Sequence, residues 1–153
     1  MGILQHTFYW LAVVCLFLTS QNITLAQNAD HILGKWLNAN KDATIEIYKE
    51  GNIYYGKIIW LAETQTDSLQ QFKLSGKDIL TNFTFSSQNK IWENGKVYYP
   101  DNGKIYHCKM WLNSDGSLSV KEYSLISILG KTTKWIRPTK THACYQNNFR
   151  NAK

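Results

Sequence analysis

The sequence lacks the features that would point to a particular chemistry. Its histidines are scattered without the spacing of metal ligands, and its serines lie in turns without the strand–turn–helix context of a catalytic nucleophile. No segment after residue 26 shows the 3.6-residue period of a long helix. These absences argue against an all-α fold, an enzyme or a metalloprotein, and we expect neither a bound metal nor a cofactor.

The N-terminus lacks charge. Its first 26 residues contain no Lys, Arg, Asp or Glu, and residues 8–18 form an almost unbroken apolar run. That run is shorter than the roughly 20 apolar residues that cross a bilayer. Thr24-Leu25-Ala26 has the small-x-small pattern that signal peptidase reads, so we expect a signal peptide over residues 1–26 and cleavage before Gln27. The sequence therefore predicts export to the periplasm or the extracellular space, with an uncleaved membrane anchor as the alternative.

The chain has 153 residues, the length of one domain, and a formal net charge of +6. Its lysines are spread along the sequence rather than clustered. They either form an ordinary solvated exterior or attract the protein to an anionic envelope surface. Because we expect export and signal cleavage, neither nucleic acid nor stable membrane insertion is expected, and the oligomeric state is left open.

Short segments of alternating apolar and polar residues are separated by turn signals. The clearest turn is Pro100-Asp101-Asn102-Gly103, because Pro presets φ, Asp and Asn bond their own backbone, and Gly accepts a positive φ. Asn94-Gly95 and Asp115-Gly116 predict further turns. The expected strands begin at residue 34 and then cover residues 43–49, 53–62, 78–85, 91–99, 104–112, 117–123 and 131–137.

About eight strands joined by hairpins fit an all-β fold, either a single up-and-down antiparallel barrel or a sandwich, over residues 27–138. Gly56 predicts a bulge within its strand. Short helical turns are expected at residues 68–72 and 125–129, and residues 139–153 are expected to form a polar tail.

The two ends of the expected sheet favour the barrel. Gly34 and Trp36 open the first strand, and Trp135 and Arg137 close the last. In a closed barrel these strands are neighbours, so Arg137 can lie over the Trp36 ring in a cation–π contact. The arrangement resembles that of lipocalins, in which an Arg from the final strand covers the Trp of an N-terminal Gly-x-Trp.

Several longer motifs extend this pattern. They are Gly34-Lys35-Trp36, Gly56-Lys57-Ile58-Ile59-Trp60-Leu61, Asp101-Asn102-Gly103-Lys104 with Tyr106 and Cys108, and Leu129-Gly130-Lys131 with Trp135 and Arg137. Together they resemble the bacterial domain-of-unknown-function family 2147 over residues 32–138. The resemblance implies a small exported calycin-like barrel of unassigned activity. Many members carry Cys in the second hairpin, where this chain has Asn52 and Tyr55, so a bridge there is absent.

Aromatic side chains are abundant, and they either pack the core or line a cup for a ligand. Strand alternation places Tyr106, Cys108 and Met110 on one face, which we assign to the interior because it is the apolar one. The candidate ligand-binding residues are Trp60, Tyr55, Tyr99, Tyr106 and Met110.

Cys108 and Cys144 follow the expected cleavage site. In an oxidising compartment they can form a disulfide that ties the polar tail to the barrel. A buried, unpaired Cys108 on its strand is the alternative.

The sequence thus predicts an exported barrel that binds a small, largely apolar ligand in its interior. The first alternative is a non-catalytic structural or interaction protein of the envelope with a filled barrel. A hydrolase-like enzyme using Glu93, Asp101 or His107 is the third. The identity of the ligand is left open.

Overall fold

The computed structural model of the chain describes residues 29–62, 73–124 and 127–139. The chain divides into two compact units, residues 1–31 and 32–153. Of the first unit only residues 29–31 are described, and residues 29–30 are helical. The expected signal peptide, the helical turn at residues 68–72 and most of the polar tail lie outside the described residues. Among the described residues, no helix is long and apolar enough to cross a membrane.

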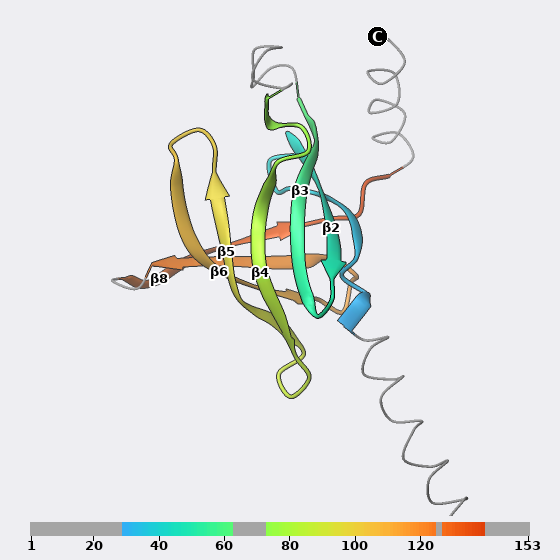
Figure 1. The fold of residues 1–153 in the computed structure, drawn as a ribbon. Helices are drawn as coiled ribbons and strands as arrows, with labels where there is room; N and C mark the ends of the chain where they lie inside the picture. The colour runs from blue at the N-terminus through green and yellow to red at the C-terminus, as the bar shows by residue number, and fades with distance from the viewer. Residues whose placement is uncertain (1–28, 63–72, 125–126, 140–153) are drawn as a thin grey trace, which may run out of the picture. The chain divides into compact units, whose positions relative to one another are not determined.

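The second unit is an antiparallel meander of eight strands (Figure 1). Each strand pairs with the next one along the chain, in the order β1 to β8. The strands are β1 (Gly34–Leu37), β2 (Ala43–Glu50), β3 (Ile53–Leu61), β4 (Asp78–Ser86), β5 (Ile91–Tyr99), β6 (Lys104–Leu112), β7 (Leu118–Ser124) and β8 (Ser127–Trp135). The predicted all-β fold of about eight hairpin-connected strands is confirmed.

The two ends of the sheet meet at a bridge between Leu37, the last residue of β1, and Ile136, which directly follows β8. The Leu37 N–H donates to the Ile136 carbonyl at 2.8 Å, and the Ile136 N–H donates to the Leu37 carbonyl at 3.0 Å. The sheet is a curled half-barrel whose first and last strands meet at this bridge. Strand β1 has only four residues, so it offers few positions at which the two strands can pair. Pairing the two ends reduces the length of unpaired sheet edge.

Turn chemistry predicts two of the hairpins correctly and one feature wrongly. Gly103 adopts φ 69° in the β5–β6 turn, and Gly116 adopts φ 78° in the β6–β7 turn. Asn94-Gly95, in contrast, is not a hairpin turn, because it lies inside β5, where the register to β6 shifts between Trp92 and Gly95. Asn94 has φ 64°, and an Asn-Gly pair that tolerates the left-handed region serves a β-bulge as well as a turn.

The expected helical turn at residues 125–129 is also wrong for the part that the structure describes. The backbone of residues 127–129 belongs to β8, and Ser127 pairs with Ser124 of β7. Cross-strand pairing in this hairpin therefore outweighs the local apolar pattern. The bulge predicted at Gly56 is confirmed, since the β3–β4 register shifts on both sides of it.

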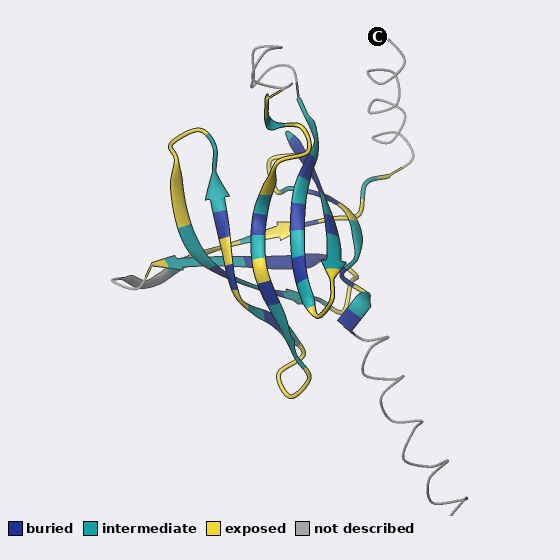
Figure 2. Cartoon of the chain, viewed as in Figure 1, coloured by how far each residue is buried: buried dark blue, intermediate teal, exposed yellow. Residues whose placement is uncertain are grey.

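The concave face of the sheet carries the core. Buried and more exposed residues alternate along the strands, as the banding of β3 and β4 in Figure 2 shows. The largest fully buried rings are those of Trp36, Tyr54, Phe83 and Trp92. Tyr54, Phe83 and Trp92 lie toward the end of the barrel that holds the β2–β3, β4–β5 and β6–β7 turns, which we call the packed end. We call the other end, which holds the β5–β6 turn, the opposite end. Trp36 pairs with Ile45 near the start of β2, beside the Leu37–Ile136 bridge.

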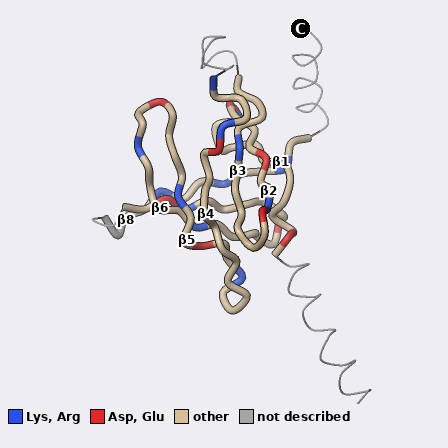
Figure 3. The backbone as a smooth tube through the Cα atoms, viewed as in Figure 1, with Lys and Arg blue, Asp and Glu red and all other residues tan. Residues whose placement is uncertain are grey.

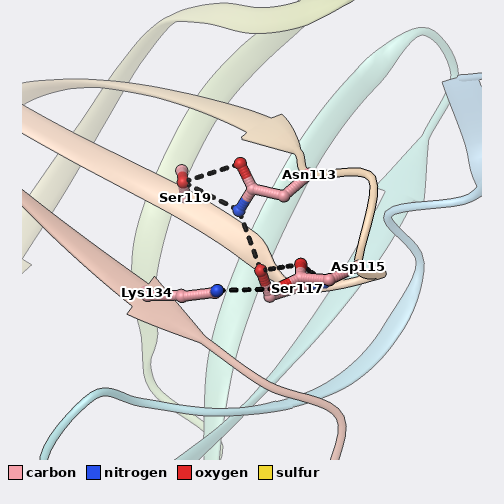
Figure 4. Close-up of polar contacts among 5 residues, drawn as sticks. All are labelled: Asn113, Asp115, Ser117, Ser119 and Lys134. Atoms are coloured by element: carbon pink, nitrogen blue, oxygen red, sulfur yellow. Dashed lines mark hydrogen bonds and ion pairs between the residues drawn. The ribbon is translucent and has the colours of Figure 1, made fainter.

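A polar cluster fixes the β6–β7 hairpin at the packed end (Figure 4). The Asn113 amide donates to the hydroxyls of Ser117 at 2.8 Å and Ser119 at 2.9 Å, and both serines are buried. Asp115 accepts from the backbone N–H and the hydroxyl of Ser117 at 3.0 and 2.5 Å, and pairs with the Lys134 ammonium at 2.6 Å. The hydrogen bond from Lys134, with those from Ser117, holds the pKa of Asp115 well below its ordinary value of 3.8.

We therefore expect Asp115→Asn to lower the thermal stability at neutral pH and to have less effect in acid. Because the folded-state pKa is depressed, the carboxylate stabilises the fold above its unfolded pKa, and this stabilisation is lost as the pH falls below about 4. Thermal melts of parent and variant across this pH range measure the difference. Asp101→Asn, in the β5–β6 turn, is the control. A melting-temperature difference for Asp115→Asn that stays constant down to the acid limit would contradict the assignment.

Candidate functional site

Three of the five predicted ligand-binding residues share the concave face of β5 and β6. Met110 is buried in the packed region, with Trp92 and Val120 as its cross-strand partners. Tyr99 and Tyr106 are half-buried at the opposite end, and their rings meet edge to face with centroids 5.8 Å apart and an interplanar angle of 84°. The two tyrosines thus form an aromatic corner, and Met110 lies deeper along the same face.

Glu122 joins this corner, although the sequence analysis did not single it out. It follows Leu118 and Val120 on the inward face of β7 and pairs with Cys108 of β6. The Tyr99 hydroxyl donates to a carboxylate oxygen of Glu122, so the contact reaches from β5 across β6 to β7. We call Tyr99, Tyr106 and Glu122 the tyrosine–glutamate corner.

The surroundings of Glu122 keep the Tyr99 phenol and the Cys108 thiol protonated. Burial raises the pKa of Tyr99, and the hydrogen bond to the Glu122 carboxylate raises it further. Burial also raises the pKa of the Cys108 thiol, with a smaller contribution from the charge of Glu122. At neutral pH the phenol is therefore a hydrogen-bond donor, and the thiol is not an activated nucleophile.

Cys108 is buried, and no disulfide joins it to another residue in the part of the chain that the structure describes. Cys144 lies outside the described residues, so the Cys108–Cys144 bridge stays a prediction.

The structure separates the other two predicted ligand-binding residues from the corner. Trp60 is half-buried near the end of β3, toward the opposite end. The β2–β3 register shifts just before it, so Trp60 pairs with Thr44 and does not continue the inward series that ends at Ile58. Its indole Nε1 is buried without a hydrogen-bond partner among the described residues. Tyr55 lies on the outer face of β3, where its ring stacks on that of Tyr48 at 5.6 Å.

The four residues predicted to close the barrel lie together where the sheet ends meet. The guanidinium carbon of Arg137 is 3.8 Å from the Trp36 ring centroid, and Arg137 Nη1 donates to the carbonyls of Leu33 at 2.9 Å and Lys35 at 3.3 Å. Gly34 has φ 102°, and a Cβ there would lie 3.1 Å from Arg137 Nη1. Trp135 is buried and pairs with Leu118. This group joins the two ends of the sheet rather than lining the corner.

The bacterial family described as "Uncharacterized protein conserved in bacteria (DUF2147)" matches residues 34–137, from the first residue of β1 to Arg137. The chain belongs to this family. The resemblance inferred from the short motifs is thereby confirmed.

A solved structure with the same fold is a Helicobacter pylori protein described as "Protein HP1028 from the human pathogen Helicobacter pylori belongs to the lipocalin family". It aligns over 76% of this chain and 88% of its own, with a TM-score of 0.57 and 17% sequence identity. At this identity the likeness shows a lipocalin-like fold and nothing further. No curated protein matches the sequence.

In this DUF2147 protein the residues considered for hydrolysis are not brought together. Glu93 pairs with Thr84 in the β4–β5 ladder, Asp101 is exposed in the β5–β6 turn, and His107 stacks on Tyr123 with ring centroids 5.7 Å apart. Among the described residues, no group of three or more His, Cys, Asp or Glu is placed to hold a metal ion. The tyrosine–glutamate corner is therefore the candidate site. It offers two aromatic rings and a carboxylate that accepts hydrogen bonds.

Proposed function

We propose that this DUF2147 protein is exported and binds a small, largely apolar ligand at the opposite end of its barrel, against the tyrosine–glutamate corner. The inward-facing hydrogen bond between Tyr99 and Glu122 carries the proposal. Glu122 lies beside Cys108 of β6 and opposite Lys131 of β8, and a partly buried carboxylate costs folding free energy unless it is hydrogen-bonded. The neighbouring inward positions of β7 hold Leu118 and Val120. Packing alone would favour an apolar residue at position 122 as well. A ligand that needs an acceptor gives a reason for Glu122.

The corner indicates the chemistry of that ligand. The rings of Tyr99 and Tyr106 offer apolar faces and edges to a flat or branched hydrocarbon body. The Glu122 carboxylate has more acceptor sites than the single Tyr99 hydroxyl occupies, so it can also accept from an N–H or O–H group. We therefore expect an apolar molecule that carries one donor group.

The alternative of a completely filled barrel fits one end of the molecule. Tyr54, Phe83 and Trp92 are buried at the packed end. At the opposite end the inward residues Tyr99, Tyr106 and Glu122 are only half-buried. This difference favours binding at the opposite end, with the packed end as a rigid base.

A fluorescent dye titration tests the proposal. We expect N-phenyl-1-naphthylamine, an apolar dye with one N–H group, to bind saturably. Tyr106→Ala should weaken binding by about tenfold, because an aromatic contact contributes on the order of 1 kcal/mol beyond the area it buries. Tyr55→Ala is the matched control, since it removes the same side chain from the outer face of β3. Equal effects of the two substitutions, or no saturable binding, would contradict the proposal.

Glu122→Gln separates the polar contact from the apolar one. Gln keeps an oxygen that can accept from Tyr99, but it removes the charge. Hydrogen bonds to charged acceptors are roughly twice as strong as neutral ones, so we expect a loss of several-fold for donor-bearing dyes. A naphthalene dye without a donor group should bind both proteins alike. A similar loss for both dyes would remove the role proposed for the carboxylate.

A further inference from the structure

The convex face of β5 to β8 carries rows of basic and aromatic side chains. The registers align them across neighbouring strands, and the rows are Lys96–His107–Tyr123, Lys109–Lys121–Thr132 and Trp111–Ser119–Lys134. The same strands place Cys108, Met110 and Val120 on the buried concave face, so alternation puts the rows on the convex face. Within these rows Ser119 is buried, and Lys109 and Lys121 are half-buried. We call these three rows the basic face, and none of its positions holds Asp or Glu.

The positive charge of this face is not balanced locally. Lys109 and Lys121 are directly opposite each other, and like charges in that position destabilise a sheet. The ion pairs within 4.0 Å that join described residues are Lys57–Glu46 and Lys134–Asp115. Lys96, Lys109 and Lys121 therefore have no carboxylate partner in the described part of the chain. A sheet that retains this repulsion is suited to bind an anionic partner.

An exposed apolar residue continues the same face toward the opposite end. Ile105 is 62% exposed, and it shares its side of β6 with His107, Lys109 and Trp111. Its cross-strand partner is Tyr98, whose ring lies 4.6 Å from the Lys77 ammonium. Figure 3 shows basic residues on the β5–β6 hairpin and on the strands beside it. Lysines, aromatic rings and an exposed aliphatic side chain match the three parts of a bilayer surface: charged headgroups, the interfacial zone and the outer acyl region.

We propose that the basic face with Ile105 binds peripherally to the surface of an anionic phospholipid bilayer. The lysines contact the headgroup phosphates, and Ile105 enters the boundary below them. The exposed Ile105 favours a bilayer over a nucleic acid or an acidic protein, since charge alone would serve those two partners. This inference is independent of the ligand proposed for the concave face.

Vesicle co-sedimentation tests the inference with protein produced from the full-length gene. We expect binding to phosphatidylcholine vesicles that contain about one third phosphatidylglycerol, little binding to pure phosphatidylcholine, and release at high salt. Lys109→Gln with Lys121→Gln should lower the partition coefficient by about 30-fold, given the usual contribution of each Lys near an anionic surface. Lys35→Gln with Lys131→Gln makes the same charge change outside the basic face and should have a much smaller effect.

A second variant decides between a bilayer and another anion. Ile105→Ser should weaken binding to the anionic vesicles several-fold and leave binding to the soluble polyanion heparin unchanged. If the two lysine pairs reduce vesicle binding equally, the basic face has no special role and the proposal fails. It also fails if Ile105→Ser binds anionic vesicles as the parent does, because the partner is then selected by charge alone.

Discussion

Replacing Trp36 with alanine is expected to lower the free energy of unfolding by about 3–5 kcal/mol, the range for truncating a buried aromatic residue. The ring is fully buried, and its indole N–H donates to the Ile32 carbonyl at 2.7 Å. Its face is covered by the Arg137 guanidinium, next to the Leu37–Ile136 bridge that joins the sheet ends. Truncation therefore removes core volume and one side of the closure together. Domains of this size have only about 5–15 kcal/mol of stability, so the variant should be close to unfolding at body temperature.

Chemical denaturation of three variants measures this effect. Trp111→Ala removes the same side chain from a half-buried position on the outer face and should cost much less. Arg137→Lys keeps the charge but loses the planar stack and the donor group that reaches Leu33 and Lys35, so an intermediate loss is expected. If the Trp36→Ala and Trp111→Ala variants unfold at the same denaturant concentration, the closure between the first and last strands does not depend on the contact of Trp36 with Arg137.

Gly95→Ala is expected to lower the free energy of unfolding by about 3 kcal/mol, in the upper part of the range for overpacking a core. A Cβ at Gly95 would lie 2.3 Å from two ring carbons of Phe83, closer than real Cβ contacts. Phe83 is fully buried, so its ring has little room to move. Gly95 is not among the positive-φ glycines, so the cost is steric rather than conformational.

A second substitution should relieve that cost. Phe83→Leu destabilises the parent on its own by leaving space in the core, but in the Gly95→Ala background it makes room for the new methyl group. The two effects should therefore be non-additive: the double variant should lose less free energy of unfolding than the two single variants lose together. Lys96→Ala, on the exposed side of the same strand, is the control. Strict additivity of the Gly95 and Phe83 substitutions in urea denaturation would rule out the predicted clash.

The features that the sequence predicts well depend on residues close together in the chain. Alternation along residues 104–112 identifies the buried side of β6, and the Asp115-Gly116 pair identifies a hairpin. The sequence predicts a turn at Asn94-Gly95 and the structure has a bulge there, because an Asn-Gly pair suits both equally well. What decides between them is the Phe83 ring lying against Gly95 from the neighbouring strand, a contact that no local pattern contains.

The pairing of Trp36 with Arg137 is an instructive exception, because it joins opposite ends of the sheet and could still be predicted. It follows from the topology itself, since the first and last strands of a curled meander meet. Glu122 had a weaker signal. It continues the alternation of Leu118 and Val120, so an acid falls at an inward position, but its partner Tyr99 is two strands away and cannot be read from that pattern.

Native mass spectrometry tests the central claim, that the opposite end of the barrel holds a small molecule, most directly. Protein produced from the full-length gene and purified without organic solvent would be compared with Tyr106→Ala and with the outer-face control Tyr55→Ala. We predict that the parent and Tyr55→Ala carry the mass of one small organic molecule, which is released on collisional activation, and that Tyr106→Ala has lost most of it. A parent protein that appears at its bare mass, and that also fails to bind the naphthylamine dye saturably, would contradict a ligand-binding role.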